Sequence, residues 1–303
     1  MPERWLVIGA RGLLAPRVVE CIEARGLDVV VAARESLQGA TGRSTVALDL
    51  ADPSSVESLF GRLPAPVDRV LCVAAMARGG ACERDPRLAE QVNAIAVGQL
   101  ADASVRAEAH FTLVSTDLVF DGRACPTDGY GEEHDPAPIG VYAATKLEGE
   151  RAVLAHSGQG LVVRLPLLYG HSRGLGSGAT DALVDGLEAG QPQTLFTDEW
   201  RTPLEVGAAA RGLVELAGGG ATGLLHLPGP ERVSRAELGR RSLAALGWTG
   251  PGPSEGTRAE LGLDKSRPED CSLDGRRARA RLSFELPDLD RGLAVWVDER
   301  GRS

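Results

Sequence analysis

Two side chains that could act together on a carbonyl group lie four residues apart in this chain of 303 residues. Tyr142 and Lys146 fall within residues 141–150, whose good helix formers would bring both side chains onto one face of a helix. A phenol is a weak acid at neutral pH, and a neighbouring ammonium ion favours its ionised form, so such a pair can exchange a proton with a reacting oxygen. An ordinary helix with an exposed Lys and a half-buried Tyr would have the same spacing.

Two adjacent hydroxyl groups follow an apolar run upstream of this helix. Residues 111–114 lead directly to Ser115 and Thr116, and their β-branched and apolar character is typical of a buried strand in a parallel sheet. Open α/β sheets bind ligands at the carboxyl ends of their strands, where these hydroxyls would lie. A strand end capped by Ser and Thr explains the segment equally well.

A glycine-containing loop near the N-terminus predicts a dinucleotide-binding site. Residues 4–22 have the pattern of a strand, a loop and a helix in direct succession. In that context Gly9 allows the tight turn after the strand, and Gly12 lets backbone amides at the start of the helix approach a pyrophosphate. The cofactor contacts predicted in this loop are Gly9, Arg11, Gly12 and Leu13.

The ends of the next three predicted strands supply the rest of the cofactor site. Arg34 follows the second strand, where an acid would bind the 2′-hydroxyl of the ribose and an arginine would accommodate a 2′-phosphate. Arg34 therefore favours NADP (NADPH), with NAD as the alternative; a surface arginine in a loop is the plainer interpretation. Asp49 and Leu50 follow the third strand, with the acid placed to reach the adenine. The fourth ends in the small residues Ala74 and Ala75, which let the chain pass close to the cofactor.

Taken together, these motifs resemble the extended short-chain dehydrogenases and, within them, the dTDP-4-dehydrorhamnose reductase group. The resemblance covers nearly the whole chain. The segments that carry it are the glycine loop, Asp49-Leu50, Ala74-Ala75, Val92-Asn93-Ala94 and residues 115–122, 142–150, 163–170, 201–203, 223–227 and 267–274.

The resemblance implies a role for each matching residue. Tyr142 would donate a proton to the substrate carbonyl, and Lys146 would lower the pKa of Tyr142 while holding the nicotinamide ribose, so both also count as cofactor contacts. Thr116 would hydrogen-bond the same oxygen, with Ser115 as the fallback, and Asn93 would support Lys146 through its backbone or a water molecule. The predicted catalytic residues are Thr116, Tyr142 and Lys146, and the predicted substrate contacts are Thr116, Asp117, Leu167 and Arg267. For Arg267, a salt-bridged surface residue is an equal interpretation.

Four departures from the family pattern surround the substrate rather than the cofactor. Leu118 stands where the family usually has Tyr, and Leu167 replaces a Trp that contacts the sugar, which removes a stacking surface. Residues 75–81 depart from the expected polar loop, and residues 171–194 are glycine-rich and lack the usual Asn-Phe.

Three functions are compatible with these motifs and departures. The first is reduction of a dTDP-4-keto-6-deoxysugar or a similar nucleotide sugar, with Tyr142 as the proton donor. The second keeps the same chemistry on a non-sugar ketone. The third is a dinucleotide-binding regulatory subunit without turnover.

Composition and patterning set the fold class and the expected partners. Alternating strand and helix patterns in residues 1–170 predict an α/β fold with a doubly wound parallel (Rossmann) sheet, on which residues 203–225 would pack back. Residues 171–303 would mainly form a smaller C-terminal substrate-binding domain. The net charge of −9 with scattered basic residues argues against nucleic acid, and no run approaches 18 apolar residues. We therefore expect a cytoplasmic enzyme that acts on a small-molecule keto substrate and binds neither a membrane nor a metal ion. A homodimer is compatible with this expectation.

Overall fold

The computed structural model describes residues 3–9, 12–34, 44–156, 158, 160–173 and 178–302. The chain divides into two compact units. Unit 1 consists of Met1–Thr116, Gly140–Arg164 and Ala210–Leu225, and unit 2 consists of Asp117–Ile139, Leu165–Ala209 and His226–Ser303. Residues 117–139, which the sequence placed in the first domain, belong to unit 2.

Unit 1 is built on a seven-stranded parallel sheet, which confirms the predicted α/β class. The strand order is β11-β6-β5-β4-β1-β2-β3, so the N-terminal strand lies near the middle. The central strands are buried, as their continuous apolar runs predict. The strands are β1 (Arg4–Ile8), β2 (Asp28–Ala33), β3 (Ser44–Ala47), β4 (Arg69–Cys72), β5 (His110–Thr116), β6 (Gly160–Leu165) and β11 (Gly223–His226).

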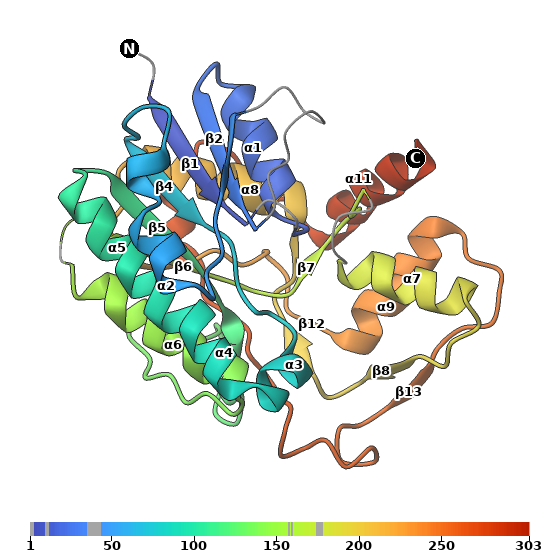
Figure 1. Ribbon diagram of the computed structural model, residues 1–303. Coiled ribbons are helices and arrows are strands. Elements are labelled where there is room, and N and C mark those ends of the chain that lie inside the picture. Colours follow the sequence, from blue (N-terminus) through green and yellow to red (C-terminus); the bar gives the residue numbers. More distant parts are fainter. Residues whose placement is uncertain are drawn as a thin grey trace. The chain divides into compact units, whose positions relative to one another are not determined.

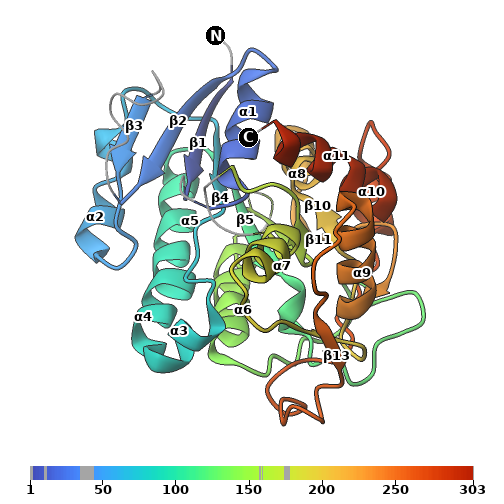
Figure 2. The same ribbon diagram turned by 90° about the vertical axis from the view of Figure 1, so that its right-hand side faces the viewer.

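Helices pack on the sheet of unit 1 and position the candidate site. Helices α5 and α6 lie side by side, and both contact β5 (Figures 1 and 2). The helical segments are α1 (Ala15–Glu23), α2 (Pro53–Glu57), a 3₁₀ turn (Phe60–Arg62), α3 (Gly79–Arg84), α4 (Pro86–Glu90), a π-helical turn (Gln91–Ile95), α5 (Ala96–Arg106), α6 (Val141–Leu154) and α8 (Val206–Gly218), which enters unit 1 at Ala210. Their shared core includes Leu6, Ile8, Val97, Leu100, Phe111 and Val153.

Unit 2 combines three two-stranded sheets with helices. Its core gathers around the buried rings of Tyr169 and Trp296. The strands are β7 (Leu168–Tyr169), β8 (Thr194–Phe196), β9 (Trp200–Arg201), β10 (Leu204–Glu205), β12 (Val233–Ser234) and β13 (Ser254–Gly256), paired as β10-β7, β12-β9 and β13-β8. The helical segments are a 3₁₀ turn (Asp117–Val119), α7 (Ala179–Glu188), α9 (Arg235–Leu246), α10 (Arg276–Arg279) and α11 (Leu289–Gly301).

Within the residues that the structure describes, no helix is both long enough and apolar enough to cross a membrane.

Candidate active site

The glycine loop begins where β1 and β4 approach each other closely. Gly9 has a φ of +114°, and a Cβ atom there would lie 2.7 Å from the backbone nitrogen of Ala74. Both observations exclude a side chain at this position without a shift of the backbone. Gly12 is exposed and Leu13 is half-buried, whereas Arg11 lies outside the described residues.

Most of the predicted cofactor residues line one pocket of unit 1, at the carboxyl ends of β1, β2 and β4. These residues are Gly9, Arg34, Asp49, Leu50, Ala74 and Ala75. The Arg34 side chain is 78% exposed, and its Nε lies 3.8 Å from the Asp49 carboxylate. The pocket therefore combines an apolar floor with an accessible guanidinium group.

Helix α6 carries both predicted acid–base groups and receives a carboxylate at its first turn. Its N-cap is Gly140, and the backbone N–H of Val141 donates a hydrogen bond of 2.8 Å to Glu83 from α3. A carboxylate there satisfies an amide that no earlier turn can pair and complements the positive end of the helix dipole. Glu83 thus fixes the start of the helix beside Tyr142, which is half-buried.

Lys146 is buried one turn after Tyr142, with only 1% of its surface exposed. Its Nζ donates a hydrogen bond of 2.7 Å to the carbonyl of Val114, two residues before Thr116 on β5. Burial lowers the pKa of Lys146, while Cys72 and Glu150 act in the opposite direction. The chain has only two lysines among its 33 Lys and Arg residues, a contrast that could have strengthened the sequence prediction.

The two adjacent hydroxyls of β5 have different surroundings. Ser115 Oγ donates a hydrogen bond of 2.5 Å to Glu150, whose carboxylate also pairs with the guanidinium of Arg164 on β6. The Ser115 hydroxyl is therefore engaged in a buried network with α6. Thr116 is buried at the end of the strand, and the preference for Thr116 over Ser115 stays a prediction.

Asn93 joins the π-helical turn to the loop after β4. Its side-chain oxygen accepts from the N–H of Met76 at 2.8 Å, and its amide nitrogen donates to Thr145 Oγ1 at 3.1 Å. Helix α6 also packs closely against the backbone of Asn93 at Gly149, where a Cβ would lie 2.3 Å from the Asn93 carbonyl oxygen. These contacts hold α6 against the π-helical turn, while support of Lys146 through backbone or water stays a prediction.

The predicted substrate contacts in unit 2 are already held by other groups of that unit. Arg267 donates to both carboxylate oxygens of Glu199 at 2.8 and 3.0 Å, so it would have to share or leave this pair to meet an anion. The predicted contact Asp117 lies 3.5 Å from Arg201, whose guanidinium also lies 3.3 Å from Glu199. Leu167 packs against the unit 2 core. Their substrate roles stay predictions.

Three carboxylates of these networks were missed by the sequence reasoning. For Glu150 a signal existed, since it extends the four-residue spacing of Tyr142 and Lys146 by one further turn. Glu83 and Glu199 find their partners through the tertiary fold, and no local spacing indicates them. Among the described residues, no group of three or more His, Cys, Asp and Glu side chains could hold a metal ion.

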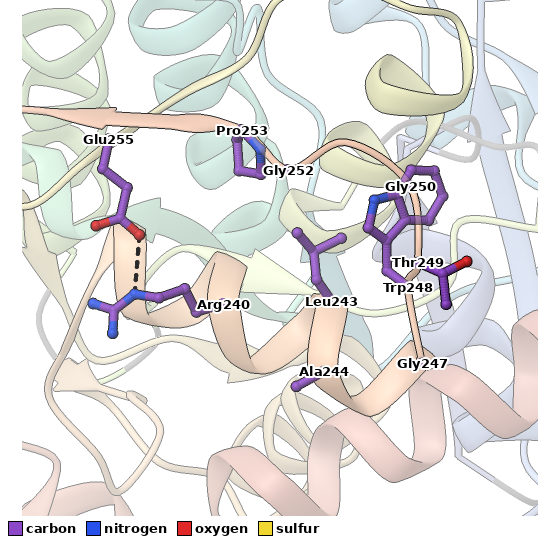
Figure 3. A pocket seen from close by; sticks show the side chains of 10 residues that line it. All are labelled: Arg240, Leu243, Ala244, Gly247, Trp248, Thr249, Gly250, Gly252, Pro253 and Glu255. Atoms are coloured by element: carbon purple, nitrogen blue, oxygen red, sulfur yellow. Dashed lines mark ion pairs between the residues drawn. The ribbon is translucent and has the colours of Figure 1, made fainter.

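A further pocket lies in unit 2, between the end of α9 and residues 247–255 (Figure 3). An ion pair of 3.0 Å between Arg240 and Glu255 lies along it, and the ring of Trp248 lines it. None of the predicted site residues contributes to this pocket, so it adds nothing to the candidate active site.

Known proteins resemble the chain over most of its length. It is 33% identical over 293 residues to the probable low-salt glycan biosynthesis reductase Agl14 of Haloferax volcanii, covering 95% of each chain. It is 29% identical to methionine adenosyltransferase 2 subunit beta of Xenopus laevis, over 78% of this chain and 70% of that one.

Solved structures share the fold. A dTDP-4-dehydrorhamnose reductase from Bacillus anthracis in complex with NADP has a TM-score of 0.85 at 23% identity, covering 99% of this chain and 100% of the other. Structures of the same fold also occur with NAD. The RmlD substrate binding domain model matches residues 3–301. The chain therefore belongs to the RmlD substrate binding domain family, among the extended short-chain dehydrogenases.

Proposed function

We propose that the chain is an NADP-dependent carbonyl reductase that acts on a nucleotide-activated keto sugar, with Tyr142 as the proton donor. The observation that carries the proposal is the buried Lys146 one turn after Tyr142 on α6. A buried ammonium whose described hydrogen bond goes to a neutral carbonyl costs stability, and an apolar side chain of similar size would avoid that cost. Such groups are concentrated at functional sites, where their charge is used.

The residues of the unit 1 pocket fit a dinucleotide. The space beside Gly9 admits no side chain. Among the described residues, a Cβ at Gly12 would find only the carbonyl of Gly9 nearby, at 3.9 Å, which leaves room above the helix start for a pyrophosphate. Arg34 presents an exposed charge for a 2′-phosphate, and the nearby Asp49 would reduce that attraction. A bound NADPH supplies the hydride for carbonyl reduction.

Three side chains of unit 1 would take part in the reduction, two of them directly at the carbonyl oxygen. The Tyr142 hydroxyl would donate its proton to that oxygen, and the Thr116 hydroxyl would donate a hydrogen bond to it. The Lys146 ammonium would favour the tyrosinate left behind, because a neighbouring positive charge stabilises the ionised phenol. Lys146 can do so only while protonated, and its burial works against protonation.

The substrate class is inferred from the relatives and from two replacements in this chain. The Haloferax relative is named for glycan biosynthesis, and the Bacillus structure is a dTDP-4-dehydrorhamnose reductase. Leu118 and Leu167 stand where the resembling reductases have aromatic residues, so a sugar would lose a stacking surface worth about 0.5–1.5 kcal/mol. We therefore expect a keto-sugar substrate, with dTDP-4-dehydrorhamnose itself as a poor one.

A substrate panel tests this function. Purified protein with NADPH would be mixed with dTDP-4-dehydrorhamnose, other nucleotide-activated keto sugars and simple ketones, and NADPH oxidation followed by absorbance. The proposal predicts turnover of at least one keto sugar, with kcat/KM for dTDP-4-dehydrorhamnose below about 10⁴ M⁻¹s⁻¹. Turnover confined to simple ketones would contradict the keto-sugar substrate and favour a non-sugar ketone.

A regulatory subunit is the second candidate function, favoured by the likeness to methionine adenosyltransferase 2 subunit beta. In that case the protein would bind NADPH without oxidising it in the presence of any ketone of the panel. Calorimetric binding of NADPH combined with a wholly negative panel would favour this function over the reductase.

A further inference from the structure

A buried carboxylate lies one helical turn beyond Lys146. Glu150 and Arg164 have 1% and 3% of their side-chain surfaces exposed. Arg164 Nη2 donates to one Glu150 oxygen at 2.6 Å and Nε to the other at 3.0 Å, while Ser115 Oγ donates to the second oxygen at 2.5 Å. One carboxylate thus joins α6 to two neighbouring strands, β5 and β6.

The same stretch of β5 also holds Lys146. Lys146 Nζ bonds to the carbonyl of Val114, and Glu150 bonds to the hydroxyl of Ser115, the next residue. Two successive turns of α6 are therefore fixed to consecutive residues of the strand that ends at Thr116. A shift of the helix along the strand would break both contacts and would move Tyr142 relative to Thr116, and misplacement of reacting groups by about 1 Å can cost 10²-fold in rate.

The charges around Lys146 single out Glu150. From β4 the facing group is Cys72, and burial raises the pKa of its thiol, so it is uncharged at neutral pH. From β5 the contact is the neutral Val114 carbonyl, and from the π-helical turn α6 receives the neutral amide of Asn93. On α6 itself Tyr142 precedes Lys146 and Glu150 follows it. Glu150 is therefore the group that brings a negative charge to the buried ammonium, with Arg164 behind it.

We propose that Glu150 is a positioning residue for Lys146: its carboxylate fixes α6 on the end of β5 and supplies the charge that keeps the buried lysine protonated. The inference rests on the proposed function for its catalytic meaning. The predicted effect on the protonation of Lys146 can be measured without any substrate. An ion pair with only a structural role would affect the stability of the fold and leave the proton affinity of Lys146 unchanged.

The lysine content makes the measurement simple. Lys146 and Lys265 are the two lysines of the chain, and Lys265 is exposed. In protein labelled with ¹³C at lysine Cε, an NMR titration therefore contains two side-chain signals, which K265R assigns. Lys265 reports the behaviour of a solvated lysine in the same sample.

Four variants separate charge from structure. E150Q removes the charge with little change of shape, E150D retains the charge, and S115A retains the ion pair. E148Q is the matched control, because Glu148 lies on the same helix in an exposed pair with Arg151. We expect E150Q to weaken the proton affinity of Lys146 about tenfold, whereas E150D, S115A and E148Q change it less than threefold and Lys265 is unaffected throughout.

The outcomes are distinct. If E150Q is folded and Lys146 titrates as in the wild type, the proposal is wrong. If E150Q does not fold, the double variant E150Q/R164M is compared with R164M, which removes the Arg164 charge alone, and equal titration of Lys146 in these two variants is equally decisive. If the titration shifts as expected but no ketone is reduced, the proposed function fails while the charge coupling stands. Where turnover is found, E150Q should lower kcat, move the alkaline loss of activity to lower pH and leave NADPH affinity within about threefold.

Discussion

The two units hold their candidate site residues in different ways. In unit 1 the predicted groups Tyr142 and Lys146 lie on successive turns of one helix, and the strand that faces them ends at Thr116. In unit 2, Arg267 is bound to Glu199, 68 residues away in the sequence, within a group of buried arginines and carboxylates. The first arrangement follows from local spacing and the second from tertiary folding. The comparison predicts that changes in unit 1 affect chemistry more than stability, and that changes in unit 2 do the reverse.

The largest expected effect is that of Tyr142→Phe on turnover. The variant keeps the ring and removes the acid, so kcat should fall by about 10² to 10⁴-fold, the usual contribution of general acid catalysis. Thermal unfolding and NADPH binding should stay close to the wild type, because Tyr142 is half-buried and its ring is retained. Steady-state kinetics with the best substrate of the panel, together with a melting curve, measure both. An unchanged kcat would remove Tyr142 from the mechanism.

Glu199→Gln should show the opposite behaviour. It leaves Arg201, which is 5% exposed, and Arg267 short of a carboxylate, and breaking a buried pair in this way costs about 3 kcal/mol. The matched control is Glu255→Gln, whose exposed pair with Arg240 should contribute less than about 1 kcal/mol. Urea unfolding of both variants makes the comparison. Equal losses would show that the buried group of unit 2 has no special role in stability.

The same variant carries a pH dependence. Burial alone would raise the pKa of Glu199, but Arg267 and Arg201 outweigh burial and hold that pKa below its ordinary value. The stabilisation is therefore fully present above the ordinary pKa of a glutamate and is lost as the pH falls through the lowered pKa. The difference in stability between wild type and Glu199→Gln should accordingly shrink in acid.

The hydroxyls of β5 provide a sharper test within unit 1. Thr116→Val should reduce kcat about 10²-fold, the size expected for loss of one hydrogen-bond donor to the reacting oxygen. Ser115→Ala should cost less than about tenfold, because Ser115 donates to Glu150 and affects the reaction only through the helix. The reverse ranking in steady-state kinetics would make Ser115 the catalytic hydroxyl.

The smallest expected effect concerns cofactor choice. Arg34→Ala should reduce NADPH affinity about tenfold relative to NADH, since a charge-assisted contact at an exposed site lies at the weak end of its range. Asp49→Asn removes the carboxylate 3.8 Å from Arg34 and should shift the same ratio toward NADPH by a few-fold. Calorimetric titration with both reduced cofactors gives the ratio of NADPH affinity to NADH affinity. If neither substitution changes this ratio, Arg34 does not contact a 2′-phosphate.

Local patterns made much of unit 1 predictable. The apolar runs ending at Ile8, Ala33 and Thr116 became strands of the parallel sheet, and the good helix formers around Tyr142 became α6. The reason is that strand burial and helical spacing are properties of short segments. The same patterns brought six predicted cofactor residues to one pocket, although what binds there stays a prediction.

The remaining features depend on contacts between distant segments. The partners that Glu83 and Glu199 find exist only after the chain has folded, so no spacing reveals them. Residues 117–139 follow β5 directly and still join unit 2, where the backbone N–H of Asp270 donates to the Gly122 carbonyl at 3.2 Å and Cys271 Sγ donates to the Phe120 carbonyl at the same distance. Arg267 illustrates the limit: the motif located it, but only the structure revealed that Glu199 already occupies its guanidinium.

The central claim is that this chain transfers hydride to a ketone with Tyr142 as the acid, and an isotope experiment tests it most directly. NADPH carrying deuterium at the transferable position of the nicotinamide would be incubated with wild type and Tyr142→Phe and the panel of keto sugars, and the products analysed by mass spectrometry. We expect one deuterium at the former carbonyl carbon of the reduced nucleotide sugar with the wild type, and at least 10²-fold less product with Tyr142→Phe. Tight NADPH binding without transfer of deuterium to any member of the panel would contradict it.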